Sequence, residues 1–391
     1  MFTNQSGAVR IGIAVNSSGA PGASSIEEQY TTSNEVFNEI ADVLRQHDAE
    51  VFKIEANGAL VEQLSTLAPS VDLIFNMAED LYQVALPMAV QQVQLELAPM
   101  PLACTGATVE GHILALNKAL ARQVLGNRVA QPDWWYLDDA EMMQTEDISF
   151  PVIIKPATEG HSLGVHQDNV VYSMAELEQA YRRLRKRFKG KLLIESFLDG
   201  VEYSIGLVGN VILPAVAWDL SQMPGQPLVR GEELKQQDLT IPHATLITEH
   251  ALLESLATQA ATAHIELGLQ DYSRSDFRSR KGSFVPCYLE TNSMPGLENL
   301  QSVLPWAAAN AGVTYPELIG SIVAQALKRL PDEYREQLHT QKFEASYRQL
   351  ELRASEGKRI TVSGREFRLL EPTQEDTLVA APLGKELAGQ M

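Results

Sequence analysis

Short apolar runs alternate with amphipathic segments over the first 76 residues, and this alternation constrains the fold more than any other feature. The runs at 10–15 (RIGIAV), 50–55 (EVFKIE) and 71–76 (VDLIFN) have the pattern of buried parallel strands. The stretches 25–47 and 59–67 between them have the apolar spacing of helices. Strands that alternate with helices form a parallel α/β sheet, which places ligands at the carboxyl ends of its strands. We therefore expect an N-terminal α/β unit with a ligand-facing edge.

The composition indicates a globular protein with more than one domain. The chain has 391 residues, 45% of them hydrophobic, and a domain usually holds roughly 100–200 residues. Its 50 acidic and 31 basic residues give a net charge of −19, which argues against nucleic-acid or anionic-membrane partners. The start of the chain lacks the apolar core of a signal peptide, and no apolar run reaches the ~20 residues of a membrane span. Since Cys104 and Cys287 are far apart and expected to be reduced, we predict a cytoplasmic protein.

A polar, irregular stretch at 127–150 predicts a domain boundary, after which the sequence pattern changes. A glycine-framed loop, ATEGHSLG, follows the next apolar run and separates two predicted strands. Ser173 and Glu176 have the spacing of a capping box at the start of a helix. We predict a small α+β unit here, with strands at 151–156, 162–166 and 191–198 and a helix at 173–188.

From residue 201 onward the chain is predicted to form hairpins and helices, with one long loop. Gly209-Asn210 is the turn of the first hairpin, and 220–246 is long enough for a lid. Helices are expected at 249–269 and near 314–330, and the tail ends in a hairpin at 359–370. The predicted divisions are an N-terminal α/β domain (1–112), a central unit (113–200), a C-terminal unit with the lid (201–330) and an extension (331–391).

A second predicted hairpin, in which RSD is followed by ETN, carries the sharpest chemical signal. Alternate residues of a strand share a face, so Arg274 lies with Asp276, and Glu290 lies with Asn292. The hairpin brings the two pairs together. Two carboxylates and an amide oxygen are hard ligands of the kind that magnesium binds beside substrate phosphates. The alternative is a pair of carboxylates on a solvated sheet face, and the tight turn after Asn292 weighs against it.

Two lysines lie where an anion could bind. Lys155 ends a buried strand, and a buried lysine needs an anionic partner. The loop after it, with Glu159, Gly160 and Ser162, offers backbone N–H groups that suit phosphates. Lys118 begins a helix, where a solvated lysine is the more common case. A glycine loop by itself is a weak motif.

The segment IESFLDGVEYS at 194–204 predicts a hinge between two units. Glu195 and Phe197 share a face of the strand, and Leu198 follows. An acceptor, an aromatic surface and free backbone groups at this point could seat a purine, and Glu202 could accept from ribose hydroxyls. An ordinary hairpin between two domains is equally compatible with the segment.

The order of these pieces resembles the ATP-grasp superfamily, and within it the D-alanine–D-alanine ligase group. A helix lysine is followed by a strand lysine, a glycine loop, E-x-F-L-x-G-x-E, R-x-D and E-x-N-x-x-P-G. The resemblance covers about residues 8–330 and is strongest over 151–208 and 271–305. It implies an ATP-grasp fold, mixed α/β and α+β, with a preceding parallel α/β domain. The extension at 331–391 lies outside the usual pattern.

The resemblance also implies a role for each matching residue. By this resemblance, Lys118 and Lys155 contact the phosphates of ATP, and the loop with Glu159, Gly160 and Ser162 covers them. Adenine is contacted by Glu195, Phe197 and Leu198, and ribose by Glu202. Two Mg²⁺ ions, which Mn²⁺ could replace, are bound by Asp276, Glu290 and Asn292. Arg274 and the backbone of Gly296 would stabilise a tetrahedral intermediate, and Ser302 would hold the carboxylate of the second amino acid.

Three departures from the family pattern fall on the amino-acid pocket. The segment after the third strand lacks the family's histidine, and the lid reads VRGEELKQQ, in which Arg230 or Lys235 could reach phosphate. His161 stands where the usual loop, Glu-Gly-Ser-Ser-Val-Gly, has its first serine. It is either a water-facing loop residue or a group beside the activated carboxylate that donates a hydrogen bond or takes the amine proton. The glutamate that works with that serine matches Glu28 or Glu27.

The resemblance therefore implies an ATP-dependent, ADP-forming carboxylate–amine ligase that acts through an acyl phosphate on substrates other than two D-alanines. Natural-product amino-acid ligases, including those of mycosporine-like amino-acid pathways, have a similar arrangement. D-alanine–D-alanine ligase of peptidoglycan synthesis is the alternative within the class. Outside the ligase class, the alternative is an inactive ATP-binding scaffold. A dinucleotide-binding enzyme is disfavoured, because the loop at 16–25 lacks the G-x-G-x-x-G motif. The expected partners are ATP and amino-acid-like molecules. The sequence leaves open whether the chain forms a homodimer.

Overall fold

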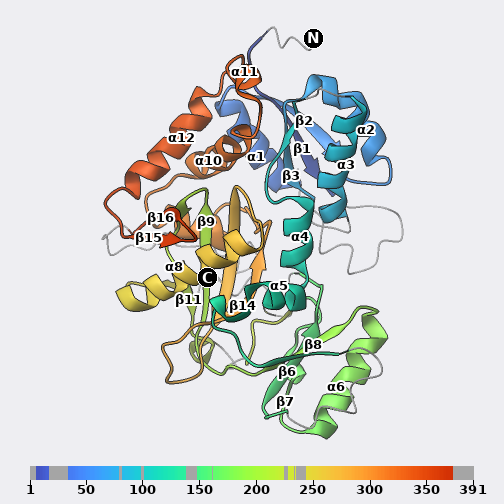
Figure 1. Ribbon diagram of the computed structural model, residues 1–391, viewed down its shortest axis with the longest axis vertical. Helices are drawn as coiled ribbons and strands as arrows, with labels where there is room; N and C mark the ends of the chain where they lie inside the picture. The colour runs from blue at the N-terminus through green and yellow to red at the C-terminus, as the bar shows by residue number, and fades with distance from the viewer. Residues whose placement is uncertain are drawn as a thin grey trace, which may run out of the picture.

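The structure is a computed structural model that describes residues 6–16, 34–78, 82–97, 101–137, 148–160, 162–223, 228–232, 234 and 244–372. Three sheets follow one another along its long axis (Figure 1). The N-terminal sheet lies at one end, the strands β6, β7 and β8 with helix α6 lie at the other, and the largest sheet lies between them. None of the helices in the described ranges combines the length and the apolar composition that a membrane span needs.

The N-terminal sheet is parallel, as the strand–helix alternation predicts. Its order is β2-β1-β3-β4, and every neighbouring pair runs in the same direction. Ile11 and Ile13 of the central strand are fully buried. The strands are β1 (Arg10–Val15), β2 (Glu50–Glu55), β3 (Leu73–Met77) and β4 (Ala103–Cys104), and the helices are α1 (Asn34–Gln46), α2 (Leu60–Leu67) and α3 (Tyr82–Glu96).

The second sheet is antiparallel, with the order β5-β8-β6-β7. Helix α6 begins after Ser173, whose side chain accepts from the N–H of Glu176, as a capping box requires. The carboxylate of Glu176 accepts from the N–H of Tyr172, one residue before the expected partner. The elements are β5 (Trp134–Leu137), β6 (Val152–Pro156), β7 (Val170–Val171), β8 (Leu192–Ser196) and α6 (Met174–Arg187).

Two predictions for this unit were wrong. The segment 162–166 forms turns instead of a strand, because Ser162 and Gly164 both have positive φ angles, of 59° and 73°. The stretch 127–150 is not irregular throughout, because 134–137 is β5 and pairs with β8 over its whole length. A four-residue strand without polar alternation gives little signal in the sequence.

The largest sheet holds the predicted hairpins. Strand β9 (Glu202–Val208) is its centre and pairs with β13 (Tyr272–Arg278), β10 (Val211–Ile212) and β11 (Val216–Trp218). After the predicted turn at Gly209-Asn210 the chain forms two short strands, β10 and β11, where a simple hairpin would have one. The remaining elements are β12 (Ala244–Leu246), β14 (Cys287–Asn292), α4 (Val109–Leu116), α5 (Lys118–Leu125), α8 (His250–Glu266), α9 (Val303–Ala309) and α10 (Tyr315–Leu327).

The tail adds to the same sheet instead of standing apart. Its predicted hairpin is present, and β16 (Arg365–Leu369) pairs in parallel with β10. Helix α12 (Gln341–Arg353) lies beside α10 (Figure 1). The tail also contacts the N-terminal unit, since the ring Nε2 of His47 lies 2.9 Å from the Ser346 hydroxyl. The other tail elements are α11 (Asp332–Arg335) and β15 (Arg359–Val362).

Candidate active site

A pocket between the second and the largest sheets gathers most of the predicted nucleotide-site residues. It is a cleft that is open to solvent, as small-molecule sites commonly are. One part of its wall is apolar, with Ile153, Phe197 and Leu289, and another part is ionic. The predicted residues that line it are Lys118, Lys155, Glu159, Ser162, Glu195, Phe197, Leu198, Glu202, Asp276 and Glu290, together with the lid candidate Arg230.

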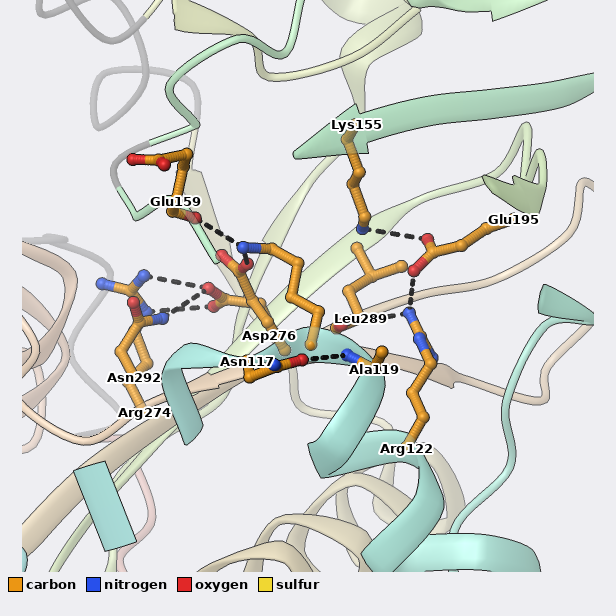
Figure 2. A network of polar contacts seen from close by, with 12 residues as sticks. Asn117, Ala119, Arg122, Lys155, Glu159, Glu195, Arg274, Asp276, Leu289 and Asn292 are labelled. Atoms are coloured by element: carbon orange, nitrogen blue, oxygen red, sulfur yellow. Dashed lines mark hydrogen bonds and ion pairs between the residues drawn. The ribbon is translucent and has the colours of Figure 1, made fainter. Parts of the chain in front are cut away.

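A buried ionic network holds Lys155 in place at the end of β6. The Lys155 ammonium lies 2.9 Å from Glu195 Oε2, and Arg122 binds the other oxygen of that carboxylate (Figure 2). Burial lowers the pKa of Lys155, while Glu195 opposes that effect. Burial by itself would raise the pKa of Glu195, but Arg122 and Lys155 outweigh it, so the net pKa is lowered. The carboxylate predicted to contact adenine therefore already has two cationic partners.

Sequence reasoning missed Arg122, the cation at the centre of this network. Its side chain is fully buried on α5, and it also donates to the carbonyl oxygens of Tyr288 (2.9 Å) and Leu289 (3.1 Å). Arg122 lies four residues after Lys118, so the two side chains point to one side of the helix. A basic pair at this spacing, with a buried strand glutamate elsewhere, was the available signal.

Lys118 lies between the glycine loop and the hairpin of β13 and β14. Asn117 caps α5 by accepting from two backbone N–H groups and so fixes where Lys118 begins the helix. The ammonium of Lys118 donates to the carbonyl oxygen of Glu159 at 2.5 Å and lies 3.1 Å from Glu290 Oε2. Lys118 is 6% exposed, so it is not the solvated helix lysine that is common at such positions.

The hairpin of β13 and β14 brings the predicted metal and oxyanion residues face to face. Asp276 pairs directly with Glu290, and Arg274 with Asn292, in the strand register. The register shifts after Asp276, so that Leu289 is the extra residue of a bulge, a feature that often re-aims side chains at active sites. This convergence is the one that the alternation of strand residues predicts.

Arg274 and Asp276 form a bidentate pair. The Nε and Nη2 atoms of Arg274 donate to the two oxygens of Asp276 at 3.0 and 2.9 Å (Figure 2). The hydroxyl of Ser204 and the amide of Asn292 also donate to Asp276. Burial would lower the pKa of Arg274, but Asp276 outweighs it and the net pKa is raised. Arg274 is therefore held as a permanent cation beside the carboxylate.

The glycine loop is joined to the lid segment 228–232. Glu232 Oε2 accepts from the N–H of Gly164 at 2.9 Å, and both terminal nitrogens of Arg187 donate to the Glu232 carboxylate at 3.0 Å. A Cβ on Gly164 would lie 2.5 Å from the ring of Phe188, so this glycine is required, whereas no described residue has an atom within 4 Å of a Cβ on Gly160. Glu232 was not identified from the sequence.

The predicted hinge also contacts the lid segment. Glu202 accepts from Arg230 at 2.9 Å, and the Arg230 guanidinium lies 3.7 Å from the centre of the Trp218 ring. The Nε atom of Arg230 is buried and has no hydrogen-bond partner within the described ranges. Arg278, a third residue not identified from the sequence, lies 5.0 Å from the centre of the Phe197 ring.

Gly296 and Ser302 lie together, apart from the pocket lining. A Cβ placed on Gly296 would be 2.6 Å from the Ser302 hydroxyl oxygen. The predicted residues His161, Glu27, Glu28 and Lys235 lie outside the described residues. Cys104 and Cys287 are free thiols, as expected.

The chemistry of the pocket fits a nucleoside triphosphate with a divalent metal ion. The apolar wall suits a base, and the two lysines suit phosphates. Across the described ranges no three His, Cys, Asp or Glu side chains form a preformed metal cluster. Two carboxylates in direct register with an adjacent amide are nevertheless the oxygen donors that Mg²⁺ uses with substrate phosphates.

Comparison with known proteins agrees with this geometry. Residues 126–324 match the family model described as D-ala D-ala ligase C-terminus. A D-alanine–D-alanine ligase of Oleidesulfovibrio alaskensis is 32% identical over 60% of this chain and 74% of its own length. An uncharacterised protein, y4sG, of Sinorhizobium fredii is 29% identical over 67% of this chain and 77% of its own length.

The fold is also that of a solved ligase. The crystal structure of a D-alanine–D-alanine ligase from Bacillus anthracis complexed with ATP matches with a TM-score of 0.63 and 20% identity, over 84% of this chain and 99% of that one. The architecture is therefore the ATP-grasp fold with a parallel N-terminal sheet, as the motif order implies. The chain belongs to the D-alanine–D-alanine ligase family, whose members are ATP-dependent, ADP-forming carboxylate–amine ligases.

Proposed function

We propose that this ligase joins an amino-acid-like carboxylate to an amine, in a pair of substrates other than two D-alanines, as natural-product amino-acid ligases do, including those of mycosporine-like amino-acid pathways. The observation that carries the ligase chemistry is the direct pairing of Asp276 with Glu290 beside Arg274 and Lys118. The substrate assignment is supported by His161, which replaces the first serine of the family's loop. The nucleotide-side residues follow the family pattern, while the amino-acid side departs from it.

The proposed reaction has two steps. A carboxylate oxygen of the first substrate attacks the γ-phosphorus of ATP and ADP leaves, which yields an acyl phosphate. The amine of the second substrate then attacks the acyl carbon, phosphate leaves with the bridging oxygen, and the amine loses a proton. Both steps build negative charge. Lys118 and Lys155 offset it on the phosphoryl oxygens, and Arg274 with the Gly296 N–H offsets it on the tetrahedral oxyanion.

We propose that adenine lies along the apolar wall and that the loop 159–164 covers the phosphates. Phe197 and Leu198 would contact the base, and Glu202 the ribose. Glu195 then acts mainly through Lys155, because its carboxylate already binds two cations. Arg230, which lines the pocket and pairs with Glu202, is our candidate for the lid contact with phosphate.

Asp276, Glu290 and Asn292 would hold Mg²⁺, or Mn²⁺ in its place, with two ions as the proposed number. The ion would supply charge neutralisation on the phosphoryl group in transfer. Asp276 already accepts hydrogen bonds from Arg274 and Asn292 of the hairpin and from Ser204 of β9, so its carboxylate is held in place.

D-alanine–D-alanine ligation is the second candidate, because relatives such as the Oleidesulfovibrio alaskensis protein carry that name. A phosphate-release assay with ATP and Mg²⁺ across single amino acids and amino-acid pairs separates the two. We expect release that depends on a pair other than two D-alanines. Strong release with D-alanine alone would establish the second candidate. ATP binding without release for any acid would support the inactive scaffold.

A further inference from the structure

Glu298 places a carboxylate in the turn that leads from β14 into α9. The backbone carbonyl of Glu298 accepts from the N–H of Ser302 at 2.9 Å, which closes the turn, and Leu300 within it has a φ of 57°. The side chain of Glu298 is half-buried. It accepts a hydrogen bond from the Ser302 hydroxyl through Oε2. Ser302 is also the N-cap residue of α9, but its hydroxyl caps no backbone N–H there.

This carboxylate borders Gly296 and Ser302, which the family pattern places at the oxyanion and at the second amino acid. A Cβ placed on Gly296 would lie 2.6 Å from Glu298 Oε2 and 2.6 Å from the Ser302 hydroxyl oxygen. The Gly296 backbone, the Ser302 hydroxyl and the Glu298 carboxylate therefore share one small space. In the family pattern, the residue matched by Ser302 holds the carboxylate of the second amino acid. Here that hydroxyl is directed to a carboxylate of the protein itself.

The charge of Glu298 is not balanced by a cation in the described part of the chain. No lysine, arginine or histidine there forms an ion pair with it. A second carboxylate, that of Glu39 on α1, acts on the same surroundings. The pKa of Tyr315 is raised by burial first and then by Glu39 and Glu298, and the Tyr315 hydroxyl donates to the carbonyl of Leu297 at 2.8 Å.

A substrate carboxylate bound at Ser302 would therefore meet an uncompensated negative charge, which disfavours like-charge contact at short range. A protonated amine or an amide N–H would meet an acceptor instead. We propose that Glu298 is a specificity-determining residue that selects an amine substrate with a cationic or hydrogen-bond-donating group at this point, and rejects one that carries a carboxylate there. This inference rests on the proposed function, in which the Gly296 N–H faces the oxyanion, and on the role that the family pattern implies for Ser302.

Alanine and alaninamide are matched probes for this subsite, because they differ in the carboxylate alone. Phosphate release would be measured with ATP, Mg²⁺ and the acid substrate found in the panel, with each enantiomer of the two probes as the amine. We expect the wild type to favour alaninamide in kcat/KM by tenfold or more, mainly through the KM of the amine. Glu298→Gln keeps an acceptor for Ser302 and should reduce that ratio by about tenfold, with the KM of ATP unchanged.

The comparison between variants cancels the different basicities of the two probe amines. Glu39→Gln removes the other carboxylate near Tyr315 and serves as the control, with a ratio within twofold of the wild type. A wild-type preference for alanine would overturn the proposal. A ratio in Glu298→Gln within twofold of the wild-type ratio would also overturn it.

Equilibrium binding separates this inference from the proposed function. If no acid supports phosphate release, the proposed function fails, and titration calorimetry of alanine and alaninamide with ATP and Mg²⁺ present decides the subsite. A preference for alaninamide that is lost in Glu298→Gln would support the role of Glu298. Equal binding of the two probes, or no binding of either to the wild type, would contradict it.

Discussion

The nucleotide side and the amine side of this site differ in how their charges are arranged. On the nucleotide side, each of the two lysines has a partner of opposite charge: Lys155 has Glu195, and Lys118 has Glu290. On the amine side, the carboxylate of Glu298 has a hydroxyl as its partner and no cation within the described ranges. The first arrangement fixes geometry before any ligand binds, while the second leaves a charge that a ligand can match.

Removing Arg122 should have the largest effect, because it breaks the most deeply buried part of the nucleotide side. Arg122→Met would leave Glu195 with Lys155 alone, and loss of one member of a buried ionic network costs about 3–5 kcal/mol. We expect the free energy of unfolding to fall by that amount and the KM of ATP to rise. Urea denaturation and steady-state kinetics would measure the two effects.

The double variant Arg122→Met with Glu195→Gln tests whether charge is the cause. It removes the uncompensated carboxylate, so part of the lost stability should return. A double variant less stable than Arg122→Met would show that packing of the arginine, and not pairing, holds this side of the site.

Arg274→Ala should reduce turnover by two orders of magnitude or more, with a modest loss of ATP binding. An oxyanion donor contributes about 2.7–4 kcal/mol to the transition state, and the nucleotide wall does not depend on Arg274. Steady-state kinetics and nucleotide titration would separate the two quantities. Arg274→Lys, which keeps the charge, is the control, and near-normal turnover in Arg274→Ala would contradict the role.

Acid should weaken the scaffold beneath the nucleotide side. The ring Nδ1 of His264 lies 2.8 Å from the hydroxyl of Ser273 on β13. Burial first, and then Arg365, lowers the pKa of His264 to about 3. Because the unfolded histidine titrates near pH 6.5, the unfolded chain takes up the proton first. The contribution of His264 to the free energy of unfolding is therefore fully present above pH 6.5 and decreases as the pH falls toward 3. The loss is about 2 kcal/mol at pH 5.

Unfolding of the wild type and of His264→Asn between pH 7 and pH 5 would measure this contribution. The wild type should lose about 2 kcal/mol more than the variant over that interval. Parallel pH profiles would show that the ring is protonated in the folded state.

Glu232→Gln should have the smallest effect, because its partner Arg187 is one-third exposed. Weakening the contact between the lid segment and the loop at Gly164 should cost about 1 kcal/mol, or about fivefold in the KM of ATP, with kcat little changed. Glu178→Gln is the matched control, because it removes an exposed ion pair with Arg182 on α6, the helix that also carries Arg187. An equal effect in both variants would assign the change to helix α6 and not to the lid.

The sequence was informative where the signal is local. The strand–helix alternation predicted the parallel sheet, and the alternation in RSD and ETN predicted which side chains share a face. It was uninformative where partners are distant. Arg122 meets Glu195 across 73 positions, and β16 pairs with β10 although more than 150 residues separate them. The turn at 162–164 depends on positive φ angles, including one at a serine, that strand patterning does not reveal.

Transfer of oxygen from the acid substrate to phosphate tests the central claim most directly. The acid would be labelled with ¹⁸O in its carboxylate and turned over with ATP, Mg²⁺ and the amine. Ligation through an acyl phosphate predicts one ¹⁸O atom in each phosphate released, detected by mass spectrometry, and the remaining oxygen in the amide product. Unlabelled phosphate released together with ADP would contradict the account, because it would show hydrolysis of ATP without activation of the carboxylate.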